Sequence, residues 1–206
     1  MIIYLLFNLI QLDSTMKKIL YFVTGNSGKF HDASKIFQNH KYQLVQYNLD
    51  LPEYQGTSHE VVFKKCHEAE HMIPSDIYPY IIEDTSLIFN CLNGLPGPYI
   101  KDFYKMLGLQ GLYKLTEPYT NKKAHVLSIL LLKMSKNTKP IMFTGFVNGL
   151  VVQPRGDKNY GWSPIFEINS PQHNIVGNTF AEVDDDTTVV PHREIVFSAV
   201  AKFLID

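Results

Sequence analysis

The chain is poor in cysteine, carries almost no net charge and lacks any apolar run long enough to cross a membrane. Its two cysteines, Cys66 and Cys91, are too few for a disulfide scaffold and form no C-x-x-C pair of the kind that binds zinc. Its 19 basic and 20 acidic residues give a net charge of -1, without the basic surplus of a nucleic-acid-binding protein. We therefore expect a reduced, cytoplasmic protein with neither nucleic acid nor a membrane as partner.

Apolar residues gather most densely at the N-terminus. Residues 2–10 read IIYLLFNLI, which is about half of the roughly 20 residues that a membrane span needs. Neither a positively charged region nor a small-residue cleavage site marks a signal peptide. The run can be an extra strand, or sequence upstream of a start at Met16. We treat residues 1–16 as an unassigned apolar extension and residues 17–206 as a single domain, because no repeat or linker divides them.

Apolar and aromatic side chains are plentiful, at 45% and 13% of the 206 residues, and can bury a core. Strand and helix patterns alternate in the first half, and long neighbouring strands fill the second. Strands are predicted over residues 19–24, 42–47, 80–82, 124–134 and 141–152. Helices are predicted over residues 28–38, 57–72, 99–107 and 192–204. This order predicts an α/β fold with a mixed sheet, with Gly145 and Gly149 as bends or bulges in the last strand.

A glycine-containing turn joins the first predicted strand to the first helix. It consists of Thr24, Gly25, Asn26, Ser27, Gly28 and Lys29. Unpaired N–H groups and the helix dipole favour a phosphate at such a place. The turn is not a Walker A loop, because Phe30 stands where that motif has Ser or Thr. On these residues alone, a phosphate-binding loop and a plain strand-to-helix turn both fit.

Acidic residues follow two of the predicted strands. Glu53 comes a few residues after the second strand, and Glu83 and Asp84 end the third. Mg²⁺ takes hard oxygen ligands and bridges substrate phosphates, so carboxylates at strand ends beside a phosphate loop would suit it. A helix cap or a solvated side chain is the ordinary alternative for each.

Further polar and aromatic side chains could contact a ligand. They are Lys65 and Lys101 in predicted helices, His192 and Arg193 at the start of the last helix, and Tyr160 and Trp162 around Gly161. Aromatic faces can stack on a nucleobase. Exposure to solvent is the alternative for the charged residues, and core packing for the aromatic ones. The residues alone thus indicate a magnesium-dependent phosphate site, without a substrate.

Eight segments, taken in order, follow one pattern. They read TGNSGK, LPEYQG, KKCHEA, EDTSLIFNCLNGLPGPYIK, FTGFVNGLVVQPRG, YGWSPIF, FAEV and HR. In this series the chain resembles the inosine triphosphate pyrophosphatase family, in particular its eukaryotic type, over residues 17–204. The stretch that begins EDTSL and ends GLPGPYIK is highly specific, whereas TGNSGK alone would not be.

The resemblance implies hydrolysis of a purine nucleoside triphosphate, with ITP, dITP and XTP favoured, to the monophosphate and pyrophosphate. The role would be to clear damaged nucleotides from the pool. It further implies Mg²⁺ as cofactor, with Mn²⁺ as an alternative, and a homodimer. The implied fold is an elongated mixed α/β sheet with flanking helices, forming two lobes around a cleft.

The resemblance also assigns roles to residues. Asp84 is the essential acidic residue, acting at the metal or as general base, with Lys29 and Glu83 as its catalytic partners. Glu53 and Asp84 would be the metal ligands. The substrate-binding residues would be the loop from Thr24 to Lys29 together with Lys65, Thr85, Lys101, Tyr160, Gly161, Trp162, Ser163, His192 and Arg193.

Three positions depart from the family pattern, all on the side that recognises the base. Ser163 replaces an aspartate, Thr187 a lysine and Pro191 a serine. A 6-keto purine presents an N1–H donor and an O6 acceptor, so loss of the charged partners predicts altered or relaxed base preference. The acids 184–186 are either replacement acceptors or a solvated turn. The competing hypothesis is a nucleotide-binding family member with weak or lost catalysis, acting as a sensor or interaction protein.

Overall fold

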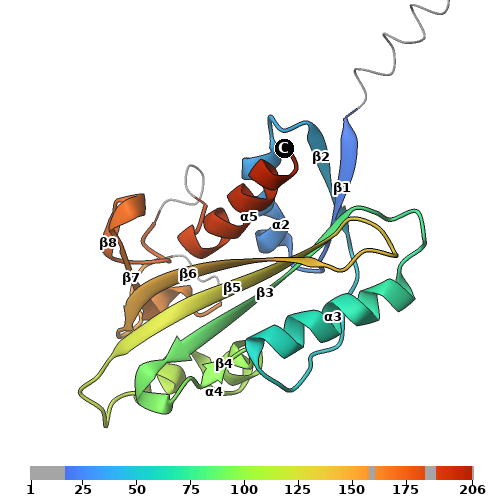
Figure 1. The fold of residues 1–206 in the computed structure, drawn as a ribbon. Helices are drawn as coiled ribbons and strands as arrows, with labels where there is room; N and C mark the ends of the chain where they lie inside the picture. Colours follow the sequence, from blue (N-terminus) through green and yellow to red (C-terminus); the bar gives the residue numbers. More distant parts are fainter. Residues whose placement is uncertain (1–16, 158–160, 184–188, 206) are drawn as a thin grey trace, which may run out of the picture.

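A mixed sheet forms the centre of the molecule, and its strand order is β2-β1-β3-β5-β6-β7-β8 (Figure 1). The computed structural model describes residues 17–157, 161–183 and 189–205. The predicted extension 1–16, Tyr160, Thr187 and the acids 184–186 therefore lie outside the described residues. The strands are β1 (Lys18–Val23), β2 (Tyr42–Tyr47), β3 (Tyr80–Phe89), β4 (Pro96–Gly97), β5 (Lys123–Lys133), β6 (Ile141–Val151), β7 (Phe166–Ser170) and β8 (Ile175–Thr179).

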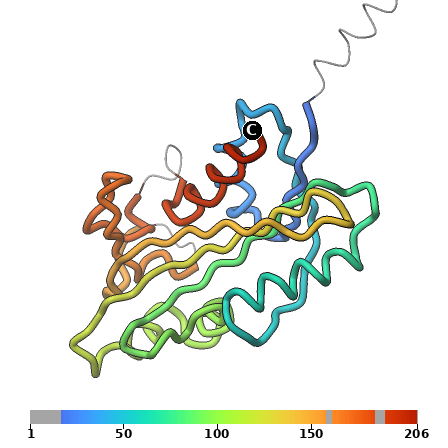
Figure 2. The backbone as a smooth tube through the Cα atoms, viewed as in Figure 1, coloured from blue at the N-terminus to red at the C-terminus, as the bar shows by residue number. Residues whose placement is uncertain are grey.

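The sheet is parallel at one end and antiparallel at the other. Strand β1 runs parallel to β2 and β3, whereas β5, β6, β7 and β8 each pair antiparallel with the strand before them in the sheet. The long strands β5 and β6 lie side by side along their whole length (Figure 2). The α/β class with a mixed sheet is confirmed. The short strands β7 and β8 were not predicted, because five-residue strands between turns have weak periodicity.

Helices cover both faces of the sheet. They are α2 (Ser27–Phe37), α3 (Ser58–Met72), α4 (Ile100–Lys114) and α5 (Pro191–Phe203), with short 3₁₀ turns η1 (Asn90–Leu92), η2 (Ser163–Ile165) and η3 (Pro171–His173). Helices α2 and α5 lie on one face, and α3 and α4 on the other (Figure 1). A capping box of Thr57 and Glu60 begins α3, within the helix predicted over residues 57–72. Among the helices of the described ranges, none has the length and apolar character of a membrane span.

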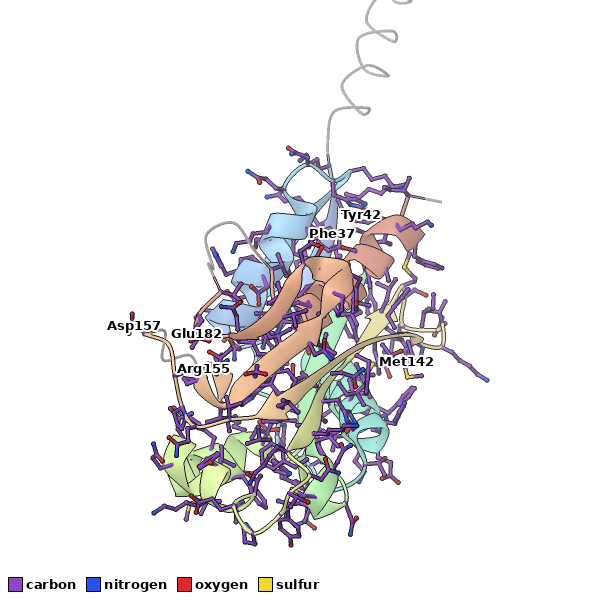
Figure 3. The ribbon with its side chains drawn as sticks, turned by 90° about the vertical axis from the view of Figure 1, so that its left-hand side faces the viewer. Phe37, Tyr42, Met142, Arg155, Asp157 and Glu182 are labelled. Atoms are coloured by element: carbon purple, nitrogen blue, oxygen red, sulfur yellow. The ribbon has the colours of Figure 1, made fainter. Side chains whose placement is uncertain are left out.

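Three buried clusters make up the core. One packs Phe22 of β1 against Phe197 of α5, and a second places Val62 and Cys66 of α3 against the opposite face of the sheet. The third lies at the far end of the long strands, around Phe166. In that region Arg155 binds Glu182 at 2.9 Å and so ties the segment after β6 to the turn after β8 (Figure 3). The cleft described below is lined by residues from the second and third of these clusters.

Two details of the sheet differ from the sequence-based expectation. Strand β3 does not end at Asp84 but continues to Phe89. The backbones of Glu83 and Asp84 both pair with β5 within this strand. Gly145 and Gly149 make no bend or bulge, because the register between β5 and β6 is continuous through both. A Cβ on Gly145 would lie 2.1 Å from the carbonyl oxygen of His192, so this glycine lets α5 lie directly on the strand.

Candidate functional site

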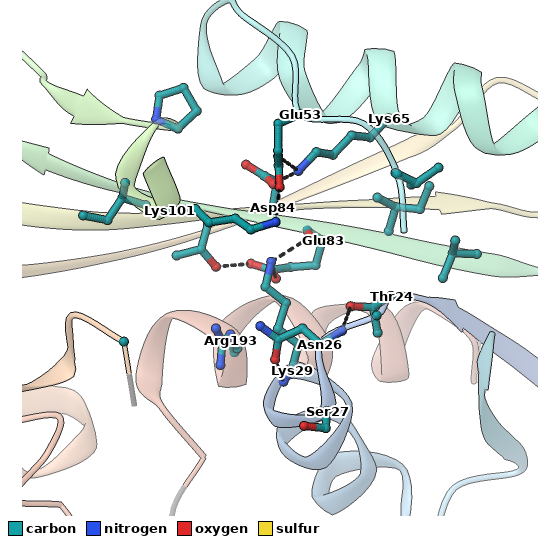
Figure 4. Close-up of a pocket in the computed structure, with 18 of the residues that line it drawn as sticks. Thr24, Asn26, Ser27, Lys29, Glu53, Lys65, Glu83, Asp84, Lys101 and Arg193 are labelled. Atoms are coloured by element: carbon teal, nitrogen blue, oxygen red, sulfur yellow. Dashed lines mark hydrogen bonds and ion pairs between the residues drawn. The ribbon is translucent and has the colours of Figure 1, made fainter. Parts of the chain in front are cut away.

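A cleft of about 790 Å³ opens where the sheet is incomplete (Figure 4). Strand β1 pairs with β3 only as far as Ile81, and β4 pairs with β3 only from Leu87. Between these two partners β3 has a free edge, which carries Glu83 and Asp84. Gaps of this kind at the carboxyl ends of parallel strands are common ligand sites in α/β proteins. Glu83 and Asp84 therefore lie at such a gap although they do not end the strand.

The predicted glycine turn borders this gap. The Asn26 side chain caps α2 by accepting a hydrogen bond from the Lys29 backbone N–H at 3.0 Å, and Thr24 Oγ1 accepts one from the Asn26 N–H at 3.1 Å. Thr24, Gly25, Asn26 and Ser27 line the cleft, whereas Gly28 does not. The turn thus brings a helix N-terminus, with its positive dipole end, to the cleft wall.

Consecutive residues of β3 serve opposite faces of the sheet. Because side chains alternate along a strand, Glu83 meets Lys29 of α2, and Asp84 meets Lys65 of α3. The two ion pairs measure 2.9 Å and 2.7 Å. Lys29 also donates to the Glu83 carbonyl at 3.1 Å, on the stretch of β3 that β1 leaves unpaired.

Glu83 is held as a permanent anion. Burial would raise the pKa of Glu83, but the charges of Lys29 and Arg193 and two hydroxyl donors outweigh it and lower the pKa to about 2. Thr85 and Ser128 each donate to Oε1 at 2.6 Å. Ser128, which sequence reasoning missed, is the only hydroxyl in the apolar strand segment VLSILLL and faces Thr85 across the ladder. A carboxylate with so low a pKa orients Lys29 and does not take up protons near neutral pH.

The second carboxylate pair shares two lysines. Lys65 binds Asp84 and Glu53, each at 2.7 Å, and Lys101 binds the other oxygen of Glu53 at 2.8 Å. Burial raises the pKa of Asp84, and the nearby Lys29 and Lys65 only partly oppose this effect. Burial also acts on Glu53, but its two lysines outweigh it and lower its pKa. We call Lys29, Lys65 and Lys101 with their carboxylates the lysine end of the cleft.

The donor set at the lysine end fits a hard divalent cation that is completed by substrate. Glu53 and Asp84 converge on one ammonium group, that of Lys65, which shows that both can serve a single positive charge. Among the described residues no cluster of three or more histidine, cysteine, aspartate or glutamate side chains forms a complete metal cage. Mg²⁺ typically uses one or two carboxylates together with substrate phosphates and water, which matches this set.

The other wall of the cleft is aromatic, and we call it the aromatic end. It consists of Trp162, Ser163, Phe180, Val190 and His192. The ring centroids of Trp162 and Phe180 lie 5.8 Å apart, and those of Phe180 and His192 lie 5.3 Å apart. Phe180 and Val190 were not predicted, because isolated apolar residues carry no pattern that separates a cleft wall from a core.

His192 and Arg193 are both buried, so the alternative of a solvent-exposed pair is wrong. His192 is 2% exposed, and neither of its ring nitrogens has a hydrogen-bond partner among the described residues. Burial and the charge of Arg193 hold the pKa of His192 well below its usual range, so the ring is neutral. Arg193 binds Asp32 of α2 at 2.7 Å, a partner that sequence reasoning missed.

Most of the predicted site residues therefore meet in one cleft. Besides the loop residues above, the structure places there Glu53, Lys65, Glu83, Asp84, Thr85, Lys101, Gly161, Trp162, Ser163, His192 and Arg193. Asn48, Asp50 and Tyr104 also line it and were not predicted. Asn48 and Asp50 lie in the loop after β2, and Tyr104 lies within α4. None of the three belongs to a recognisable motif.

The fold and this site define a Ham1-type α/β protein, and the sequence agrees. The Ham1 family model matches residues 20–203, so the chain belongs to the Ham1 family. The inosine triphosphate pyrophosphatase of Ajellomyces capsulatus is 37% identical over 90% of this chain and 94% of its own length. That of Chaetomium globosum is 39% identical, over 90% and 91%.

Solved structures support the fold independently. A Ham1 protein from Coxiella burnetii matches with a TM-score of 0.76 at 20% identity, covering 91% of this chain and 98% of its own. The Staphylococcus aureus Ham1 protein matches with a TM-score of 0.70 at 21% identity, over 90% and 98%.

Proposed function

We propose that this chain is a hydrolase that cleaves the α–β anhydride of purine nucleoside triphosphates, with ITP, dITP and XTP among its substrates. The products are the monophosphate and pyrophosphate. The observation that carries the proposal is the convergence of three lysines and three carboxylates on the gap beside β3. The names of the fungal relatives, which are inosine triphosphate pyrophosphatases, support the substrate class.

The lysine end suits a triphosphate because its charges can exchange partners. A triphosphate carries about four negative charges, which catalysis of phosphoryl chemistry must neutralise. Lys101 is 70% exposed at its side chain and shares Glu53 with Lys65, so both can turn to phosphate oxygens. Lys29 and the α2 N-terminus approach from the opposite wall. The protein thus positions the chain of phosphates between two helices.

Glu53 and Asp84 are the residues that would hold Mg²⁺, or Mn²⁺ in its place. When bound, the ion would neutralise phosphate charge and orient the anhydride for in-line attack. Lys65, which pairs with both carboxylates here, would then be available to the phosphate oxygens of the substrate. Metal and triphosphate are therefore expected to bind cooperatively.

Asp84 is the residue that would accept the proton of the attacking water. It lines the cleft, and its buried position favours the protonated form more than in water. As a bond forms between the water oxygen and the α-phosphorus, the bond from that phosphorus to the bridging oxygen breaks, and pyrophosphate leaves with the electron pair. Glu83 acts as a positioning residue that keeps Lys29 in place.

Pyrophosphate release from ITP, XTP, dITP, ATP and GTP with Mg²⁺ tests this proposal, with the Asp84→Asn variant as control. We expect release from ITP by the wild-type chain and almost none by the variant. The second candidate function, a nucleotide sensor without turnover, is favoured only by the three departures from the family pattern at Ser163, Thr187 and Pro191. Nucleotide binding without release from any substrate would support that candidate instead.

We further propose a cytoplasmic homodimer that uses the open face of β6. Met142, Phe146 and Leu150 alternate along this face and are each more than a third exposed (Figure 3 labels Met142). An uncharged stripe of this kind can meet its own copy across a twofold axis. Light scattering after gel filtration should give a dimer for the wild-type chain and a monomer for Phe146→Glu. Unchanged circular dichroism would show that the variant remains folded.

A further inference from the structure

The side chains of the aromatic end that can accept a hydrogen bond from a base can also donate one. Among the described residues of this end, these are Ser163 and His192, and both are uncharged; the indole N–H of Trp162 only donates. A hydroxyl rotates to donate or accept, and a neutral imidazole carries one donor and one acceptor that exchange between tautomers. Arg193, the nearest fixed charge, is paired with Asp32 at 2.7 Å.

The purine edges that such a site must distinguish differ in the order of their hydrogen-bond donor and acceptor. A 6-keto purine presents a donor at N1 and an acceptor at position 6, whereas a 6-amino purine presents the reverse. A site rejects the wrong pattern strongly only when its own buried groups would be left unpaired by it. A fixed carboxylate meets that condition, because it accepts but never donates when ionised. Ser163 and His192 do not meet it.

His192 adds unused hydrogen-bonding capacity. Both of its ring nitrogens are buried and have no hydrogen-bond partner in the part of the chain that the structure describes, a state that is rare for native polar groups and that a ligand in the cleft would relieve. The ring lies 5.3 Å from Phe180 and 6.3 Å from Trp162, measured between centroids, so a stacked base and this imidazole share one wall. Exchange between the two tautomers lets a ring nitrogen donate to one purine edge and accept from the other.

From these features we propose that the aromatic end accepts 6-amino as well as 6-keto purines, so that ATP is hydrolysed nearly as well as ITP. The inference rests on the proposed pyrophosphatase function and extends its substrate class to ordinary adenine nucleotides. Ser163 is the specificity-determining residue, because it occupies the position at which a carboxylate would impose the 6-keto pattern.

The test compares kcat/KM for ITP and ATP in three matched proteins. We expect a ratio within about tenfold for the wild-type chain, and Ser163→Asp should raise it by about tenfold or more, since its carboxylate accepts from N1–H and repels the adenine N1. In the Ser163→Asn variant the new side chain has about the size of aspartate but can both donate and accept. Its ITP-to-ATP ratio of kcat/KM should therefore stay near that of the wild type. A wild-type ratio above about a hundredfold would overturn the proposal and favour the acids 184–186 as acceptors.

A binding measurement separates this inference from the proposed function. Calorimetric titration of Asp84→Asn with IDP and with ADP reports base preference without turnover. Affinities within about tenfold of each other support the permissive site even if the wild-type chain releases no pyrophosphate, a result that would refute only the enzymatic proposal. A preference for IDP above about a hundredfold overturns the inference whatever the activity.

Discussion

At the lysine end of the cleft each of the three lysines has a carboxylate within 2.9 Å, whereas at the aromatic end His192 has no hydrogen-bond partner among the described residues. The first arrangement is preorganised charge, in which each lysine is held by at least one carboxylate. The second is neutral and adaptable. On the proposed function, reaction chemistry falls at the first end and base recognition at the second, so we expect substitutions at the two ends to have different kinetic signatures.

The largest effect is expected from Asp84→Asn at the lysine end. Loss of the proton acceptor and of one metal ligand should lower kcat by roughly 10²–10⁴-fold. The loss should be equal for ITP and ATP, because the substitution leaves the aromatic end unchanged. Steady-state kinetics with both nucleotides checks this, and a change in the ITP-to-ATP ratio would contradict the separation of the two ends.

Glu83→Gln tests the lysine end through the free energy of unfolding. It would leave the Lys29 ammonium, 15% exposed at its side chain, without its anion. Breaking a buried pair in this way costs about 3–5 kcal/mol, measurable as a fall in the urea midpoint. The control Glu182→Gln removes an exposed partner of Arg155 and should cost at most about 1 kcal/mol. Equal losses in the two variants would show that Glu83 is not specially placed.

His192 provides a pH test of the aromatic end. Its folded-state pKa lies well below 6.5, so the unfolded chain takes up the proton more readily. The stability contributed by neutral His192 is complete above pH 6.5 and is lost as the pH falls, by about 1.4 kcal/mol per unit until the folded pKa is reached. In urea titrations at several pH values, His192→Gln should lack this loss, and the exposed control His59→Gln should retain it.

Gly145→Ala should give a smaller change. The added Cβ would meet the His192 carbonyl and push α5 away from β6, at a cost of about 1–3 kcal/mol. The neighbouring control Thr144→Ala lies on the exposed face and should stay within about 0.5 kcal/mol. Thermal unfolding of both variants measures the difference. A stable Gly145→Ala protein would mean that α5 does not depend on this close approach.

The sequence predicted the fold where local patterns were strong. The apolar run over residues 19–24 and the helices predicted over residues 57–72 and 192–204 each identified an element correctly. It misjudged β3, because charged residues normally end a buried strand and the lysines that neutralise Glu83 and Asp84 come from distant helices. The free edge of β3 follows from unequal strand pairing, which no local pattern encodes.

The same limit applies to the site. Ser128 and Asp32 reach the site only through sheet register and helix packing, so their roles depend on tertiary structure. The roles assigned to the residues of both ends, and the contribution of Tyr160 and Thr187, stay predictions.

The glycine beneath α5 has a consequence for how the protein can change. Because Gly145 has no side chain, the start of α5 is fixed by contact between two main chains. The backbone position of His192 is therefore independent of which side chains occupy residues 163 and 191. On the proposed function, these two residues can be exchanged while α5 stays in register. Single substitutions would then alter nucleotide preference without rebuilding the lysine end of the cleft.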